Sequence, residues 1–152
     1  MKIKIIALGK VNESYLKVGV DEFLKRISPY CPIEVIEIKP VEVKDDNLIK
    51  RSLDMEAEKI LSFIKPSSFV ITMEIEGKML SSEDFAEQIN AIANSGTNEL
   101  VFVIGSSHGI SEKVSCRADY KLSLSKMTIL HTFARLLLVE QIYRAFKIIK
   151  GE

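Results

Sequence analysis

The stretch of sequence that decides the fold is "NELVFVIGSSHGIS", residues 98–111. Five consecutive apolar residues end at Gly105, and a short polar segment follows them. An apolar run of this length, stopped by a glycine, is typical of a strand that is covered on both faces. The segment "SSFVITMEI", residues 67–75, has the same character. Two such strands predict a mostly parallel sheet with helices on both faces.

Outside these two runs, strand patterns alternate with helix patterns, which predicts one α/β domain over residues 1–152. Further strands are expected at residues 2–9, 33–40 and 120–126. Helices are expected at residues 15–27, 45–64, 81–92 and 131–150. Ser81, with Asp84 three residues later, resembles a capping box, and "EGK" at residues 76–78 predicts a turn.

The composition limits where the protein works and what it binds. Lys+Arg and Asp+Glu both number 21 in 152 residues, so a protein that coats nucleic acid through a large positive excess is excluded. The N-terminus lacks the pattern of a signal peptide, and no apolar run could cross a bilayer. Two cysteines, Cys31 and Cys116, indicate free thiols rather than a disulfide. We expect a reduced, cytoplasmic protein without membrane contact.

The last helix pattern, "HTFARLLLVEQIYRAFKIIK" at residues 131–150, is apolar around most of its circumference. A helix of this kind is buried on all sides, either within one subunit or against a second copy of the chain. We favour a homodimer, in which Leu138 and Ile142 belong to the outward face.

Residues 105–109 also form G-x-S-x-G, the nucleophile motif of serine hydrolases, and Asp119 and His131 follow Ser107 in the order of such a triad. That motif must lead directly into a helix, whereas "ISEKVSCRADY" allows about two turns before the next strand. A hydrolase that uses Ser107 is therefore a remote alternative. Neither phosphate-loop motif is present, and the Cys and His residues lack metal-ligand spacing, so we expect no metal.

Three segments of the C-terminal half are distinctive in combination: "FVIGSSHGIS", "LSLSKMTILH" and "ARLLLVEQIYRAFKIIKGE". Here the chain resembles the RlmH family of the SPOUT methyltransferases, and the resemblance extends over nearly the whole chain. It implies a C-terminal trefoil knot, a homodimer, S-adenosylmethionine as cofactor, and methylation of N3 of a pseudouridine in 23S (large-subunit) ribosomal RNA.

The resemblance also implies which residues form the site. The cofactor contacts carried over by position are Met73, Gly105, Leu124, Ser125, Lys126, Met127, Thr128 and Ile129. At Gly105 the missing Cβ would let the backbone approach the cofactor. His131 and Arg135 are candidates for handling the proton that N3 loses, and the general base stays unassigned.

Three positions differ from the family pattern. Ser106 stands where a second glycine is usual, Leu130 where proline is frequent, and the sequence ends at Glu152, where the family continues into a Tyr-His-basic tail associated with its active site. The chain either has a longer natural form or lacks part of that apparatus. A cofactor-binding protein without catalysis, or a ribosome-binding dimer without chemistry, therefore stays open.

RNA binding is expected to use a local basic patch. From Arg117 to the end, seven basic residues stand against three acidic ones, namely Arg117, Lys121, Lys126, Arg135, Arg144, Lys147 and Lys150 against Asp119, Glu140 and Glu152. Such a patch contacts phosphates without reading sequence. Because the net charge is zero, we expect shape to contribute, and the assembled ribosome to be the substrate rather than a free RNA.

Overall fold

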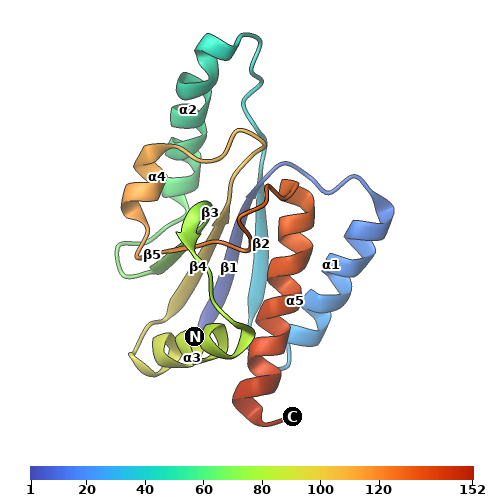
Figure 1. The fold of residues 1–152 in the computed structure, drawn as a ribbon. Coiled ribbons are helices and arrows are strands. Elements are labelled where there is room, and N and C mark those ends of the chain that lie inside the picture. Colours follow the sequence, from blue (N-terminus) through green and yellow to red (C-terminus); the bar gives the residue numbers. More distant parts are fainter.

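The computed structural model describes residues 1–152 as a five-stranded sheet with helices on both faces (Figure 1). The strand order is β2-β1-β4-β3-β5, and every neighbouring pair is parallel. The strands are β1 (Lys2–Leu8), β2 (Ile33–Ile38), β3 (Phe69–Lys78), β4 (Glu99–Ile104) and β5 (Tyr120–Leu122). The predicted α/β class and parallel sheet are confirmed.

The helices divide between the two faces of the sheet. One core cluster joins the sheet to α1 (Ser14–Ile27), α3 (Ser82–Asn94) and α5 (His131–Lys150). The other joins it to α2 (Ile49–Ser62) and α4 (Glu112–Arg117). In the central strand β4, Phe102 belongs to the first cluster and Val101 to the second, and every residue of the strand is buried. The apolar run that decides the fold is therefore covered on both faces, as predicted.

Several local predictions are confirmed at the level of hydrogen bonds. The Ser81 hydroxyl accepts a hydrogen bond from the Asp84 N–H at 3.0 Å and caps α3. The helix expected at residues 45–64 is shorter than predicted, because Asp45 caps a short 3₁₀ helix, Asp46–Leu48, and α2 itself runs from Ile49 to Ser62. The last helix begins at His131 and ends at Lys150, as expected.

The predicted turn at residues 76–78 is wrong, because β3 continues through Lys78. At Gly77 the strand passes very close to β5, and a Cβ there would lie 2.6 Å from the Lys121 carbonyl oxygen. The pairing of β3 with β5 is irregular, with a shift between Met73 and Lys78. The fifth strand is also shorter than predicted and ends at Leu122, so that the chain continues as a loop.

The expected outward face of α5 is also wrong. Leu138 and Ile142 are 0% exposed, because α5 packs against the sheet between α1 and α3. The exposed apolar side chains of α5 are instead Phe133 (40%) and Leu137 (41%), with Ile148 near its end. None of the helices combines the length and apolar character that a bilayer span requires. The trefoil knot stays a prediction.

Candidate functional site

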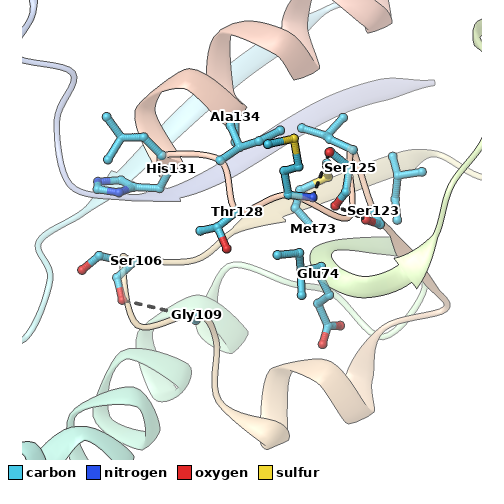
Figure 2. A pocket seen from close by; sticks show the side chains of 16 residues that line it. Met73, Glu74, Ser106, Gly109, Ser123, Ser125, Thr128, His131 and Ala134 are labelled. Carbon is cyan, nitrogen blue, oxygen red and sulfur yellow. Dashed lines mark hydrogen bonds between the residues drawn. The ribbon is translucent and has the colours of Figure 1, made fainter.

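A pocket of about 290 Å³ lies at the carboxyl edge of the sheet, where β3, β4 and β5 end. Side chains from β3, from the loop after β4, from the loop after β5 and from the first turn of α5 line it (Figure 2). Parallel α/β sheets bind ligands at this edge, because the loops that follow neighbouring strands converge there.

Six of the eight predicted cofactor residues line this pocket, although they come from two distant segments. They are Met73, Leu124, Ser125, Met127, Thr128 and Ile129. Lys126 belongs to the same loop but is exposed and does not line the pocket. Gly105 lies outside it as well.

The loop after β5, residues 123–130, is irregular but held by its own hydrogen bonds. The Ser123 hydroxyl donates to the Ser125 carbonyl at 2.9 Å, and the Ser125 hydroxyl accepts from the Met127 N–H at 3.0 Å. The N–H groups of Leu124, Thr128 and Ile129 have no partner within the protein. All three residues line the pocket, and since backbone donors are normally paired with protein or water, their N–H groups are candidates to bind a ligand there.

The structure gives Gly105 a different role from the expected one. A Cβ at Gly105 would lie 2.4 Å from the Gly109 carbonyl oxygen and 2.5 Å from a methyl group of Ile110. Those atoms belong to a tight turn in which Ser106 and Gly109 exchange backbone hydrogen bonds of 3.2 and 2.9 Å. Gly105 therefore makes room for its own loop rather than for a ligand, and the ligand-facing residues are Ser106, Ser107 and Gly109.

That loop is anchored at its far end by Ser111, which is buried. The Ser111 hydroxyl accepts from the Lys113 N–H and so caps α4, and it donates to the Asp54 carboxylate of α2 at 2.7 Å. This hydrogen bond from Ser111 lowers the pKa of Asp54. One side of the pocket is therefore fixed against α2.

His131 and Arg135, the two candidate catalytic residues, lie in different surroundings. His131 begins α5 and lines the pocket, and its buried Nδ1 has no hydrogen-bond partner. Arg135, one turn later, is only 3% exposed and does not line the pocket. Its guanidinium bonds the Glu37 carboxylate at 2.5 Å and the Gly9 carbonyl at 2.9 Å. Arg135 therefore joins α5 to the ends of β1 and β2.

The structure offers no serine triad. Ser107 is exposed in the turn, and α4 begins only at Glu112. Asp119 accepts from the Val70 N–H at 2.8 Å and pairs with Arg117 at 3.2 Å, so it braces the start of β3. Neither Ser107 nor His131 bonds this carboxylate, and the activation that a serine nucleophile needs is missing.

Comparison with known proteins settles the family. Residues 1–152 match the family described as predicted SPOUT methyltransferases. The chain belongs to this family. It is 48% identical over 158 aligned residues to the ribosomal RNA large subunit methyltransferase H of Clostridioides difficile (strain 630), an alignment that covers 100% of this chain and 98% of that protein.

Among solved structures, a probable methylase family protein from Haemophilus influenzae Rd KW20 is similar in fold. The TM-score is 0.54 at 12% sequence identity, and the match covers 98% of this chain and 66% of the other. At this identity the likeness concerns the fold alone.

The pocket of this SPOUT chain suits S-adenosylmethionine in its donor set. Met73, Leu124 and Met127 provide apolar surface for a flat adenine ring, and the three unpaired N–H groups provide donors. The His131 Nδ1 adds a buried polar atom that has no partner within the protein. No group of three or more His, Cys, Asp or Glu side chains is arranged to hold a metal ion.

Several lining residues were not predicted from the sequence, and Glu74 is the only acidic one among them. Glu74 directly follows Met73 on β3 and lies on the pocket wall. In the sequence, Glu74 is recognisable only as an acidic residue at the end of an apolar run. A carboxylate that points into solvent has the same pattern, so the sequence could not single out Glu74.

The basic patch is smaller than the sequence suggested. Arg117, Arg135, Arg144 and Lys147 are paired with carboxylates of the same chain. Lys121 and Lys126 are exposed and form no ion pair; Lys121 lies on β5, and Lys126 lies within the loop that lines the pocket. These two are the cations best placed to meet a phosphate near the site.

Proposed function

We propose that this chain is an S-adenosylmethionine-dependent methyltransferase that modifies large-subunit ribosomal RNA, at N3 of a pseudouridine. The observation that carries the proposal is the 48% identity, along the whole chain, with a protein named for methylation of large-subunit ribosomal RNA. The pocket supports it, because residues expected at a cofactor site from two distant segments line one cavity.

In this proposal the pocket holds the cofactor and aims its methyl group at the RNA base. S-adenosylmethionine supplies a methyl group bound to a positively charged sulfur, which is already a good leaving group. The protein therefore needs to align the two reactants and exclude other nucleophiles. Met127 and Leu124 would provide the apolar contacts for the adenine, and the N–H groups of Leu124, Thr128 and Ile129 would provide hydrogen-bond donors to it.

His131 is our candidate for handling the proton that N3 must lose. Its ring lines the pocket, and Nδ1 has no partner in the protein. His131 also stands at the N-terminus of α5, where the residue before it, Leu130, provides no side-chain cap. The free N–H groups of that helix end stabilise negative charge that develops on the base. Arg135 acts in positioning, through Glu37 and Gly9.

The proposed enzyme is a homodimer that works on the ribosome in the cytoplasm. Exposed apolar side chains from α1 and from the start of α5 form the candidate contact between subunits, namely Tyr15, Val18, Leu130, Phe133 and Leu137. The rings of Tyr15 and Phe133 lie 6.2 Å apart, so the two helices contribute to one surface. Because this surface adjoins His131, the second subunit would complete the RNA-binding face beside each pocket.

The decisive experiment measures methyl transfer from labelled S-adenosylmethionine to ribosomes from a strain that lacks its own enzyme. We expect the unchanged chain to label one pseudouridine of the large-subunit RNA, and His131→Ala to transfer at least about 100-fold more slowly while it still binds the cofactor. Free large-subunit RNA is the comparison substrate, and we expect it to be methylated poorly.

Two other outcomes would replace this proposal. Cofactor binding without transfer would indicate a binding protein that lacks catalysis. Ribosome binding without cofactor binding would indicate an assembly or binding factor without chemistry. Isothermal titration with S-adenosylmethionine separates these two outcomes.

The dimer has its own test in Leu137→Glu. This side chain is 41% exposed, so the subunit should fold, whereas a carboxylate in a subunit contact is destabilising and occurs twice across a two-fold axis. We expect a monomer by light scattering, with lower transfer. Lys150→Glu, an exposed charge change at the other end of α5, is the control and should leave the dimer intact. A dimeric Leu137→Glu would exclude this face as the contact.

A further inference from the structure

Glu74 provides the only carboxylate among the side chains that line the pocket, and no Lys or Arg side chain accompanies it there. Figure 2 shows Glu74 next to Met73 on β3, with its carboxyl group directed away from His131, and the hydrogen bonds from Ser115 place that group beside α4. The rest of the lining is apolar or neutral, apart from the His131 ring. The pocket therefore carries one fixed negative charge on an otherwise uncharged wall.

Two hydroxyl groups hold the Glu74 carboxylate in place. The Thr72 hydroxyl, on the same strand, donates to Oε2 at 2.6 Å. The Ser115 hydroxyl, on α4, donates to Oε1 at 2.9 Å and to Oε2 at 3.1 Å. Thr72 is buried and Ser115 half-buried, so the carboxylate is fixed from two separate elements.

No cationic side chain neutralises this carboxylate. Every salt bridge of the chain lies elsewhere, and Glu74 takes part in none within 4.0 Å. Neutral hydroxyls orient a carboxylate but leave its charge uncompensated. A half-buried negative charge on the wall of a ligand pocket, without a partner in the protein, attracts a positively charged ligand group.

From this geometry we infer that Glu74 recognises the positive charge of the cofactor, with Thr72 and Ser115 as positioning residues. The inference rests on the proposed function, in which the pocket binds S-adenosylmethionine. That molecule has two cationic centres, the sulfonium and the amino group of its methionine part, and either centre can meet a carboxylate. Methyl transfer removes the sulfonium charge, so contact with that centre would also favour exchange of the spent product for fresh cofactor.

Three ligands separate the two cationic centres. S-adenosylmethionine carries both, S-adenosylhomocysteine carries the amino group alone, and methylthioadenosine carries neither. Isothermal titration of each ligand into the unchanged chain and into Glu74→Gln reads the charge contribution without any turnover. Glutamine keeps the shape and hydrogen-bonding capacity of the side chain but removes its charge.

We expect Glu74→Gln to weaken binding of S-adenosylmethionine by about tenfold or more, in the range of interactions with charged groups, and to leave methylthioadenosine unchanged. An equal loss for S-adenosylhomocysteine assigns the contact to the amino group, and no loss assigns it to the sulfonium. Ser115→Ala should give a smaller loss in the same ligand order, because the charge stays but its position is less fixed.

Glu76→Gln is the matched control, because it removes an exposed carboxylate two residues further along β3 and should change none of the three affinities. Unchanged binding of S-adenosylmethionine by a folded Glu74→Gln, or equal weakening of all three ligands, would overturn the inference alone. Failure of the unchanged chain to bind any of the three would overturn the proposed function, and this inference with it.

Discussion

The two halves of the carboxyl edge of the sheet differ in which of their polar groups have hydrogen-bond partners. At the ends of β1 and β2, the Arg135 guanidinium bonds the Glu37 carboxylate and the Gly9 carbonyl, so it joins three elements, and only its buried Nε is left without a partner. At the ends of β3, β4 and β5, the His131 Nδ1 and three backbone N–H groups have no partner. Because buried polar groups are normally paired, the unpaired His131 Nδ1 on the pocket wall favours a ligand in the second half, whereas the two bonds of the Arg135 guanidinium join elements of the fold in the first.

Among the variants that test this contrast, Gly105→Val should have the largest effect. Gly105 is the first residue of the loop that follows β4. Because even a Cβ would lie 2.4 Å from the Gly109 carbonyl oxygen, we expect the variant to lose more than about 4 kcal/mol of unfolding free energy, or not to fold. Urea unfolding followed by circular dichroism measures the loss. Ser107→Val, with an exposed side chain in the same loop, is the control and should stay within about 0.5 kcal/mol. A stable Gly105→Val without cofactor binding would restore the role predicted from sequence.

Arg135→Met tests the other half of the edge. The change leaves Glu37 without its partner, but this carboxylate is 38% exposed and can be solvated, so we expect a loss of about 1–2 kcal/mol, between the values for exposed and buried pairs. Affinity for S-adenosylmethionine should stay within about threefold, because Arg135 does not line the pocket. Arg135→Met combined with Glu37→Leu should recover part of the stability. Unchanged stability with greatly weakened cofactor binding would instead place Arg135 in the site.

The sequence predicts the helices and strands of this molecule better than it predicts which residues contact one another in the fold. The apolar run through Phe102 and the long last helix follow from local periodicity, and the structure has both. The close approach at Gly77 and the turn behind Gly105 depend on atoms distant in sequence or on the shape of a loop, so a lone glycine did not reveal them. The inward position of Leu138 depends on α1 and α3 packing on either side of α5.

For the site as well, positions in the sequence were predicted better than contacts between side chains. The cofactor residues were expected from the family resemblance, which concerns position in the sequence, and the structure brings most of them to one pocket. Glu74 was missed because two hydroxyl groups orient its carboxylate, and one of them lies 41 residues away on α4 while the other is on the same strand. Arg135 was expected at the site, together with His131, as a candidate for handling the proton that N3 loses. In the structure, one turn of α5 separates His131 at the pocket from Arg135 at its ion pair with Glu37.

Ser107→Ala should give the smallest effect, and it tests whether the loop serves chemistry or shape. Ser107 is exposed, the Asp119 carboxylate is bonded to Val70 and Arg117 instead of to a triad, and no helix begins directly after Ser107. If the loop only shapes the pocket wall, loss of one hydroxyl should reduce methyl transfer by less than about tenfold, or about 1.4 kcal/mol of activation free energy. Parallel titration with S-adenosylmethionine would assign any loss to binding. Covalent labelling of Ser107 in the unchanged chain by a fluorophosphonate probe, absent in Ser107→Ala, would show that Ser107 is an activated nucleophile. The pocket would then be a hydrolase site rather than a cofactor site.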